Sequence, residues 1–290
     1  MAGTDSLTEV EAGLDALERA PARERAPALR VLRTRVLPPV LACALVLLVW
    51  QGVYAAGVKP DYLLPGPADV GHALADQWYE GTLFSTVWTS VRRGLAGFVV
   101  AVVLGTLLGL LVARVRPVRA ALGPVLSALQ SLPSVAWVPA AVIWFGLTDT
   151  TLYVVILLGA VPSVANGLLA GVDQVPHLYL RAGRVLGAGG LSGVRFVLLP
   201  AALPGYLSGL KQGWAFAWRS LMAAELIASS PELGLGLGQL LEGARSYQDM
   251  PLVLAAIVEI LAVGIVVDLL LFAPVERRVM RNRGLSFARD

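Results

Sequence analysis

The sequence contains few of the residues from which catalytic and metal centres are built. It has a single cysteine, Cys43, and two histidines, His72 and His177, which lie far apart along the chain. One cysteine excludes a disulfide framework, and so few cysteines and histidines argue against a metal site. The patterns GxxxxGK(S/T), HExxH and GxSxG are absent as well. We therefore expect no enzyme activity and no cofactor bound by this chain, so that any ATP hydrolysis must come from another protein.

Charged residues are also scarce. They make up 15% of the chain, whereas 57% of the residues are hydrophobic and the mean hydropathy is +0.71. These values exclude an ordinary soluble globular protein. The formal net charge is +3, and we attribute this basic excess to membrane topology and not to nucleic-acid binding. A glycine-rich stretch, Gly234-x-Gly236-x-Gly238, is expected in an outer loop and not between a strand and a helix, which argues against a dinucleotide site.

Long apolar runs dominate the rest of the sequence, and each is long enough to cross a hydrocarbon core of roughly 30 Å. They predict an all-α integral membrane protein with about six transmembrane helices, near 37–57, 88–114, 119–146, 151–172, 197–227 and 252–274. Three prolines in the third run, Pro124, Pro133 and Pro139, predict a kink or a break. Pro200 and Pro204 predict a bend where the fifth run enters the bilayer.

The distribution of basic residues gives the orientation. With residues 1–36 in the cytoplasm, the cytoplasmic pieces are 1–36, 114–119, 173–196 and 275–290, and they hold seventeen of the 23 Lys and Arg residues. Only Lys59, Arg245, Arg92 and Arg93 lie on or near the outer side. This asymmetry predicts that both termini are cytoplasmic. It divides the chain into a cytoplasmic tail (1–36), a transmembrane domain (37–275) with a cytoplasmic loop at 178–195, and a second tail (276–290).

Ionisable side chains within the expected spans indicate functional sites by default. They are Arg92, Arg93, Lys211, Arg219, Glu225, Glu259 and Asp268. They could form a polar pathway or gate, or they could form ion pairs that fix helix packing. We favour a packing ion pair between Glu225 and either Arg92 or Arg93, because these residues lie at similar depths. Lys211 and Arg219 have fewer obvious partners and are better candidates for lining the path of an anion.

Small and aromatic residues in the spans leave two interpretations open. Gly205-x-x-x-Gly209-x-x-x-Gly213 allows close helix packing, within the chain or between chains. Four tryptophans could line an apolar path, although aromatic side chains in such helices more often pack; they are Trp137, Trp144, Trp214 and Trp218.

The most informative segment is the polar stretch at 181–200, between two apolar runs. It carries Arg181, Arg184 and Arg195 and no acidic residue. Its spacing, Gly187-x9-Val197-x-Leu199-Pro200, resembles the EAA loop of ABC-importer permeases, written EAA-x3-G-x9-I-x-LP. The resemblance extends to three other stretches, and it favours the nitrate, sulfonate and taurine subgroup; the stretches are Leu63–Pro67, Ser131–Gly146 and Ala215–Leu226.

The resemblance implies a type I importer permease fold in a bacterial inner membrane. It also implies that two permease copies, most simply a homodimer, bind two ATPase subunits that carry ATP and Mg²⁺, and that an extracytoplasmic binding protein delivers the solute. The loop would then be a coupling helix that docks on the ATPase through residues Arg181, Ala182, Gly183, Gly187, Val197, Leu199 and Pro200. The family begins this motif with Glu-Ala-Ala, whereas this chain has Arg181-Ala182-Gly183, so an ionic contact made there would change sign.

Two rival functions predict different behaviour. An ion-coupled secondary transporter would use the buried acids and would need no ATPase. A non-transporting assembly subunit would tolerate neutralisation of Arg219. A membrane enzyme is disfavoured because the sequence has no catalytic constellation. The basic residues of the fifth run favour a small anionic solute, such as a sulfonate, taurine or nitrate.

Overall fold

A computed structural model describes residues 37–230 and 233–282, and all regular secondary structure in these residues is helical. The predicted tail at 1–36 lies outside them. The chain forms two units, Met1–Val58 and Lys59–Asp290, which are described separately. In the first unit, α3 (Leu37–Ala55) is apolar along its whole length and long enough to span a membrane.

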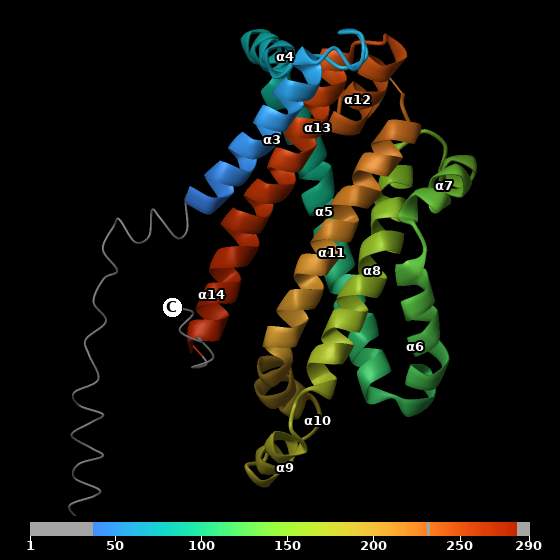
Figure 1. Ribbon diagram of the computed structural model, residues 1–290. Helices are drawn as coiled ribbons and strands as arrows, with labels where there is room; N and C mark the ends of the chain where they lie inside the picture. Colours follow the sequence, from blue (N-terminus) through green and yellow to red (C-terminus); the bar gives the residue numbers. More distant parts are fainter. Residues whose placement is uncertain (1–36, 231–232, 283–290) are drawn as a thin grey trace, which may run out of the picture. The chain divides into compact units, whose positions relative to one another are not determined.

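The second unit contains the remaining helices (Figure 1). In chain order they are α4 (Pro67–Tyr79), α5 (Thr82–Arg114), α6 (Arg116–Ser131), η2 (Ser134–Trp137), α7 (Val138–Phe145), α8 (Asp149–Asp173), α9 (His177–Val185), α10 (Gly190–Gly193), η3 (Val194–Leu198), α11 (Leu199–Ile227), α12 (Leu237–Ser246), α13 (Met250–Val267), η5 (Asp268–Phe272) and α14 (Ala273–Asn282). Five helical stretches of the described residues can cross a membrane alone, and a bent pair makes a sixth span. The predicted all-α membrane fold with about six spans is confirmed.

The predicted break in the third span is present. The α6 helix and the following segment Ser134–Phe145 are bent by 98°. Pro133 disfavours a helical conformation in the residue before it, and Leu132 is extended, with φ −80° and ψ 128°. Pro124, by contrast, lies inside α6, and Pro139 lies in the first turn of α7, where a proline costs no hydrogen bond.

A π turn precedes Pro200, close to the predicted bend. Helical backbone runs without a break from Gly190 to Ile227. Pro200 lies in the first turn of α11, and the five residues before that helix, Val194–Leu198, form a π turn. The extra residue of a π turn distorts the helix locally, and π turns and prolines are the usual causes of bends in helices.

Two short helices, α4 and α12, were not predicted from the sequence. The α4 helix begins at Pro67, and the Asp69 carboxylate accepts a hydrogen bond from the Gly66 backbone N–H at 2.8 Å. A carboxylate bonded in this way stabilises the start of a helix. Both helices lie at the end of the second unit opposite α9 and α10 (Figure 1).

Helices α8 and α11 pack along most of their lengths and form the centre of the second unit. Their backbones touch at glycines: a Cβ atom on Gly205 would lie 2.6 Å from the Cα of Gly171, and a Cβ atom on Gly209 would collide with the Cα of Gly167. The glycine repeat of the fifth run therefore serves packing within one chain.

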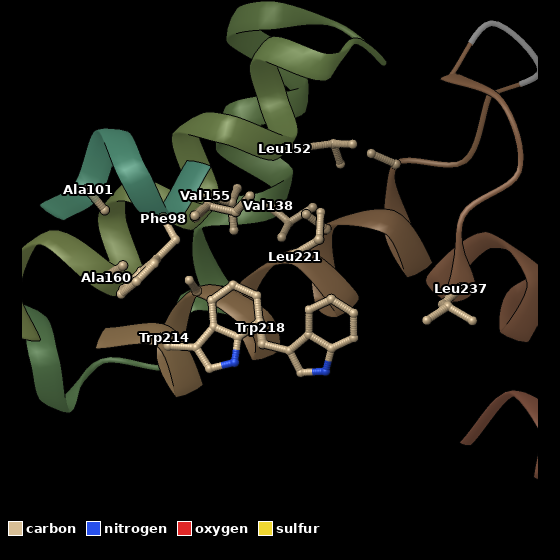
Figure 2. Packing of buried hydrophobic residues seen from close by; sticks show 14 of the residues in the cluster. Phe98, Ala101, Val138, Leu152, Val155, Ala160, Trp214, Trp218, Leu221 and Leu237 are labelled. Atoms are coloured by element: carbon tan, nitrogen blue, oxygen red, sulfur yellow. The ribbon is translucent and has the colours of Figure 1, made fainter. Parts of the chain in front are cut away.

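The hydrophobic core lies against this helix pair (Figure 2). The Trp214 and Trp218 rings stack with centroids 5.9 Å apart, and the Phe98 ring meets Trp214 edge to face at 5.5 Å. The Trp218 indole N–H donates to the Ile260 carbonyl at 3.2 Å. Both tryptophans are buried, so they pack in the core and line no path.

Candidate functional site

A polar cavity of about 520 Å³ lies between α6, α8 and α11, with Met280 of α14 at its edge. This volume is in the range of small-molecule sites. Its polar lining consists of uncharged side chains, which are Gln130, Asn166, Gln174, Ser208 and Gln212. The Asn166 amide donates to the Gln130 carbonyl oxygen at 2.9 Å, which links α8 to α6 across one wall.

The lining residues are brought together by helical spacing. Asn166 and Ala170 of α8 and Gln174, the C-cap of that helix, recur every four residues, and Ser208 and Gln212 do so on α11. Each set therefore lies on one face of its helix. Gly205 and Gly209 also line the cavity and fill little of it. This site was not predicted from the sequence, because its polar residues are uncharged amides and a hydroxyl. The signal that could have found it is uncharged polar residues at helical spacing in otherwise apolar spans.

The buried charges form a separate cluster near the outer end of the helices. Glu225 of α11 is fully buried and the side chain of Arg93 of α5 is 3% exposed. An Arg93 Nη1–H donates to Glu225 Oε1 at 3.2 Å, and the Ser90 hydroxyl donates to Glu225 Oε2 at 2.7 Å. The Arg93 Nε–H also donates to Asp149 at the start of α8, at 2.9 Å. The structure thus pairs Glu225 with Arg93, while Arg92 is exposed.

The glycine-rich stretch before α12 packs against this cluster. The Gly238 backbone N–H donates to Glu225 Oε2 at 3.0 Å, and the Leu237 N–H donates to the Ser90 hydroxyl at 2.8 Å. A Cβ atom at Gly236 or at Gly238 would lie 2.6 Å from an atom of Glu225. The glycines therefore let the backbone approach a buried carboxylate. Arg93 also donates to the Leu233 carbonyl, so the cluster holds this segment to α5 and α11.

The other predicted charges lie elsewhere. Glu259 of α13 accepts a hydrogen bond from the Gln77 amide of α4 at 2.9 Å. Lys211 forms an ion pair with Asp268 at 2.8 Å. Arg219 is exposed, and its guanidinium lies 4.7 Å from the centre of the Phe216 ring. Neither Lys211 nor Arg219 lines the polar cavity.

Arg219 nevertheless shares a helix face with the cavity. Ser208, Gln212, Ala215 and Arg219 are spaced by four, three and four residues and are all exposed. This spacing places them on one face of α11. A polar stripe therefore runs from the cavity toward the outer end of the helix and ends in a guanidinium.

The segment at 177–198 forms a helical element beyond the cytoplasmic ends of the spans. Gly187, with φ +83°, ends α9: the Ala188 N–H donates to the Gly183 carbonyl at 2.8 Å, and the Gly187 N–H donates to the Arg184 carbonyl at 3.1 Å. This is the Schellman arrangement, which needs a left-handed residue and thus favours glycine. Gly183 is buried against Val197. A Cβ atom at position 183 would lie only 2.8 Å from the Val197 side chain, so this contact favours glycine.

The element carries exposed apolar and basic side chains. Val185, Leu186 and Leu191 are 87%, 86% and 87% exposed. Arg181, Arg184 and Arg195 are exposed around them, and the chain has no acidic residue from 174 to 224. Exposed apolar side chains gathered on one element indicate a protein contact surface. Val197, Leu199 and Pro200 lie behind this surface, at the junction with α11.

Helices that cross the bilayer around a polar cavity, and a cationic helix that leaves the bilayer, are the parts of an integral membrane transport protein. Residues 101–281 match the family described as "Binding-protein-dependent transport system inner membrane component". The chain therefore belongs to this family, and it is a multi-pass protein of the bacterial inner membrane.

Individual relatives agree with this assignment. The chain is 32% identical to the taurine transport system permease protein TauC of Escherichia coli, over 78% of this chain and 82% of that protein. It is 29% identical to the putative aliphatic sulfonates transport permease protein SsuC of Bacillus subtilis, over 79% and 82%. A chain of the inward-facing MetNI methionine ABC transporter superposes with a TM-score of 0.57 at 20% identity, over 68% of this chain and 95% of that chain. The type I importer permease fold is confirmed.

Proposed function

We propose that this protein forms the translocation path of an ATP-driven importer for a small anionic or zwitterionic solute. The observation that carries the proposal is a cavity that opens on the surface of a single chain and is lined by amides and a hydroxyl of the membrane-spanning helices. Polar groups in a bilayer are costly and are kept where they line a path or a binding site. The cavity has the volume for a small solute and contains groups that can both donate and accept hydrogen bonds.

The nature of the solute is proposed from two observations. The cavity has no charged side chain among its lining residues, but the stripe on α11 continues to Arg219. A guanidinium can guide a sulfonate or another anion without holding it tightly, whereas neutral amides can solvate it at the cavity. The relatives named for taurine and for aliphatic sulfonates support this class of solute.

We also propose that a separate ATPase subunit drives transport by docking on the element at 177–198. The exposed Val185, Leu186 and Leu191 would enter an apolar groove of that subunit, and ATP and Mg²⁺ would be bound there and not by this chain. Because the element is cationic, the groove should carry acidic residues around its rim. An extracytoplasmic binding protein would deliver the solute to the outer side.

The polar stripe also supports a second permease copy. Ser208, Gln212 and Arg219 are exposed on α11 in a single chain, where they would face lipid. Lipid contact of a guanidinium and an amide is unfavourable. We propose that the same face of a second copy covers the stripe, so that a homodimer encloses the path.

Uptake by cells tests the proposed path. In a strain deleted for this gene and complemented with the wild type, we expect ATP-dependent uptake of 35S-labelled taurine. Gln212→Leu should reduce the rate about tenfold, which corresponds to the loss of one hydrogen bond of ~1.4 kcal/mol. Ser85→Leu is the matched control, because Ser85 is an exposed hydroxyl of α5 that bonds only within its own helix.

The outcomes separate the rival functions. Equal uptake in the Gln212 and Ser85 variants, at equal membrane levels, would contradict the proposed path. Uptake of nitrate but not taurine would keep the path and change the solute. Uptake by the purified chain alone in proteoliposomes, driven by an ion gradient, would show a secondary transporter. Full uptake by an Arg219→Gln variant, at equal membrane levels, would favour a non-transporting assembly role.

A further inference from the structure

A second cavity, of about 340 Å³, lies at the cytoplasmic ends of α5 and α8. Its other walls are α9, α10 and the π turn η3. Two guanidinium groups line it, Arg114 from the last turn of α5 and Arg184 from α9. This cavity is separate from the polar one, because the two share no lining residue.

The positive charge of this cavity is not neutralised by the chain. No acidic residue lines it, and among the described residues neither Arg114 nor Arg184 forms an ion pair. Arg184 makes only a bond from its Nε–H to the Leu180 carbonyl, at 3.3 Å. The acid at the end of α8, Asp173, is held by Arg119 at 2.6 Å. Both lining arginines thus have guanidinium N–H groups free for a ligand.

The floor of the cavity is apolar and continues onto the surface of the helix bundle. Leu198, Val172 and Leu180 lie among its lining residues. Leu107 and Leu111, seven and three positions before Arg114 on α5, are exposed and lie on the same helix face. The positive-inside distribution puts this end of α5 at the cytoplasmic leaflet. A ligand here would meet two cations at the interface and a strip of leucine toward the bilayer centre.

We propose that this cavity binds the phosphate of an anionic phospholipid from the cytoplasmic leaflet. Arg114 and Arg184 would hold the phosphodiester through charge-assisted hydrogen bonds, and an acyl chain would lie along Leu111 and Leu107. Basic pockets between helices on the cytoplasmic side commonly bind such head groups. The lipid would join α5 to α9, and so would brace the cationic element against the membrane. This inference requires only the membrane topology and does not rest on the proposed transport function.

Native mass spectrometry of the full-length protein in detergent tests the site directly. With added phosphatidylglycerol, the wild type should retain one tightly bound lipid. Arg114→Gln combined with Arg184→Gln should weaken the apparent affinity at least about tenfold, since each basic residue near a membrane surface contributes about 1 kcal/mol. The control is Arg277→Gln with Arg278→Gln, a pair of exposed arginines on α14 that do not line this cavity. It should bind like the wild type. Circular dichroism checks that all variants are folded.

Three outcomes would overturn the proposal. One is equal retention of phosphatidylglycerol by the Arg114/Arg184 variant and the control. Another is equal retention of phosphatidylcholine, because its choline cation should be repelled by the two arginines and equal retention would show no selectivity for a net negative charge. The third is displacement of the lipid by millimolar inorganic phosphate, which would identify a free anion as the ligand. If the variant keeps the lipid and loses a co-purified ATPase subunit, the cavity belongs to a protein partner and the lipid assignment is wrong.

Discussion

At the scale of single residues, the best-defined feature is the carboxylate of Glu225. It accepts bonds from a guanidinium and a hydroxyl of α5 and from a backbone N–H of α12. A carboxylate buried in this way stabilises the structure only while all its partners are present, because an unpaired buried charge is expensive. The residue is therefore a structural anchor for the outer end of α11.

We predict that Glu225→Ala destabilises the protein by about 3–5 kcal/mol, because it removes the buried one of the two carboxylates that pair with the buried Arg93. The matched control is Glu242→Ala, which removes a second glutamate that is paired with an arginine among the described residues. The Arg245 guanidinium lowers the pKa of the Glu242 carboxyl by a hydrogen bond, but this pair lies on the surface, where its loss should have no measurable effect. Unfolding in detergent, followed by circular dichroism, measures both. Equal stability of the two variants would show that the buried cluster around Glu225 does not stabilise the outer end of α11.

The sequence alone could not predict which arginine pairs with Glu225. Arg92 and Arg93 are adjacent, so they point in directions about 100° apart on α5, and only the rotation of that helix selects one of them. The sequence contains no local signal for this rotation. The cavity lined by Gln130, Asn166 and Gln212 could not be predicted for a related reason. These three residues come together only through the way in which α6, α8 and α11 cross. By contrast, Pro133 acts on its own neighbour, and the break it causes could be predicted from the sequence.

At the scale of elements, the contact between α8 and α11 decides the shape of the polar cavity. The two backbones meet at Gly167 and Gly209, both of which line the cavity. A side chain at this crossing would push the helices apart and change the wall that carries Asn166 and Gln212. Packing and the candidate site therefore depend on the same glycines.

Gly209→Ala is expected to lower the unfolding midpoint and to reduce uptake, because its Cβ atom would collide with the backbone of α8. Overpacking of this kind typically costs about 1–3 kcal/mol. Gly123→Ala on α6 is the control, since a Cβ atom there would meet nothing within 4 Å. Thermal unfolding and taurine uptake should both separate the two variants. If Gly123→Ala were as unstable as Gly209→Ala, the collision between α8 and α11 would not be the cause of the lower stability.

At the scale of the whole molecule, the spans and the basic residues give one consistent topology. The sequence predicted the number of spans because hydrophobic length is set by the bilayer and needs no knowledge of packing. It did not predict α4 and α12, because short amphipathic helices at an interface lack a long apolar run. These helices and the element at 177–198 lie at opposite ends of the second unit (Figure 1).

Cysteine labelling tests this topology. Cys43 is the chain's only cysteine, so Cys43→Ala gives a cysteine-free background. In that background, Tyr247→Cys should react with a membrane-impermeant maleimide in spheroplasts, whereas Leu191→Cys should react only after permeabilisation. Both positions are nearly nine-tenths exposed, so access and not burial decides the result. The opposite labelling pattern would invert the assigned orientation.

The unbroken helix from Gly190 to Ile227 has a mechanical consequence. Its 38 residues extend about 57 Å, at about 1.5 Å per residue. One end of this rod lies in the cytoplasmic contact element, and Glu225, clamped by Arg93, lies at the other. A tilt at the cytoplasmic end must then either swing the outer anchor in the opposite direction or be absorbed by the π turn at Val194–Leu198. The stiffness of the π turn at Val194–Leu198 thus determines how much of a movement at the cytoplasmic end is transmitted to the outer end of α11.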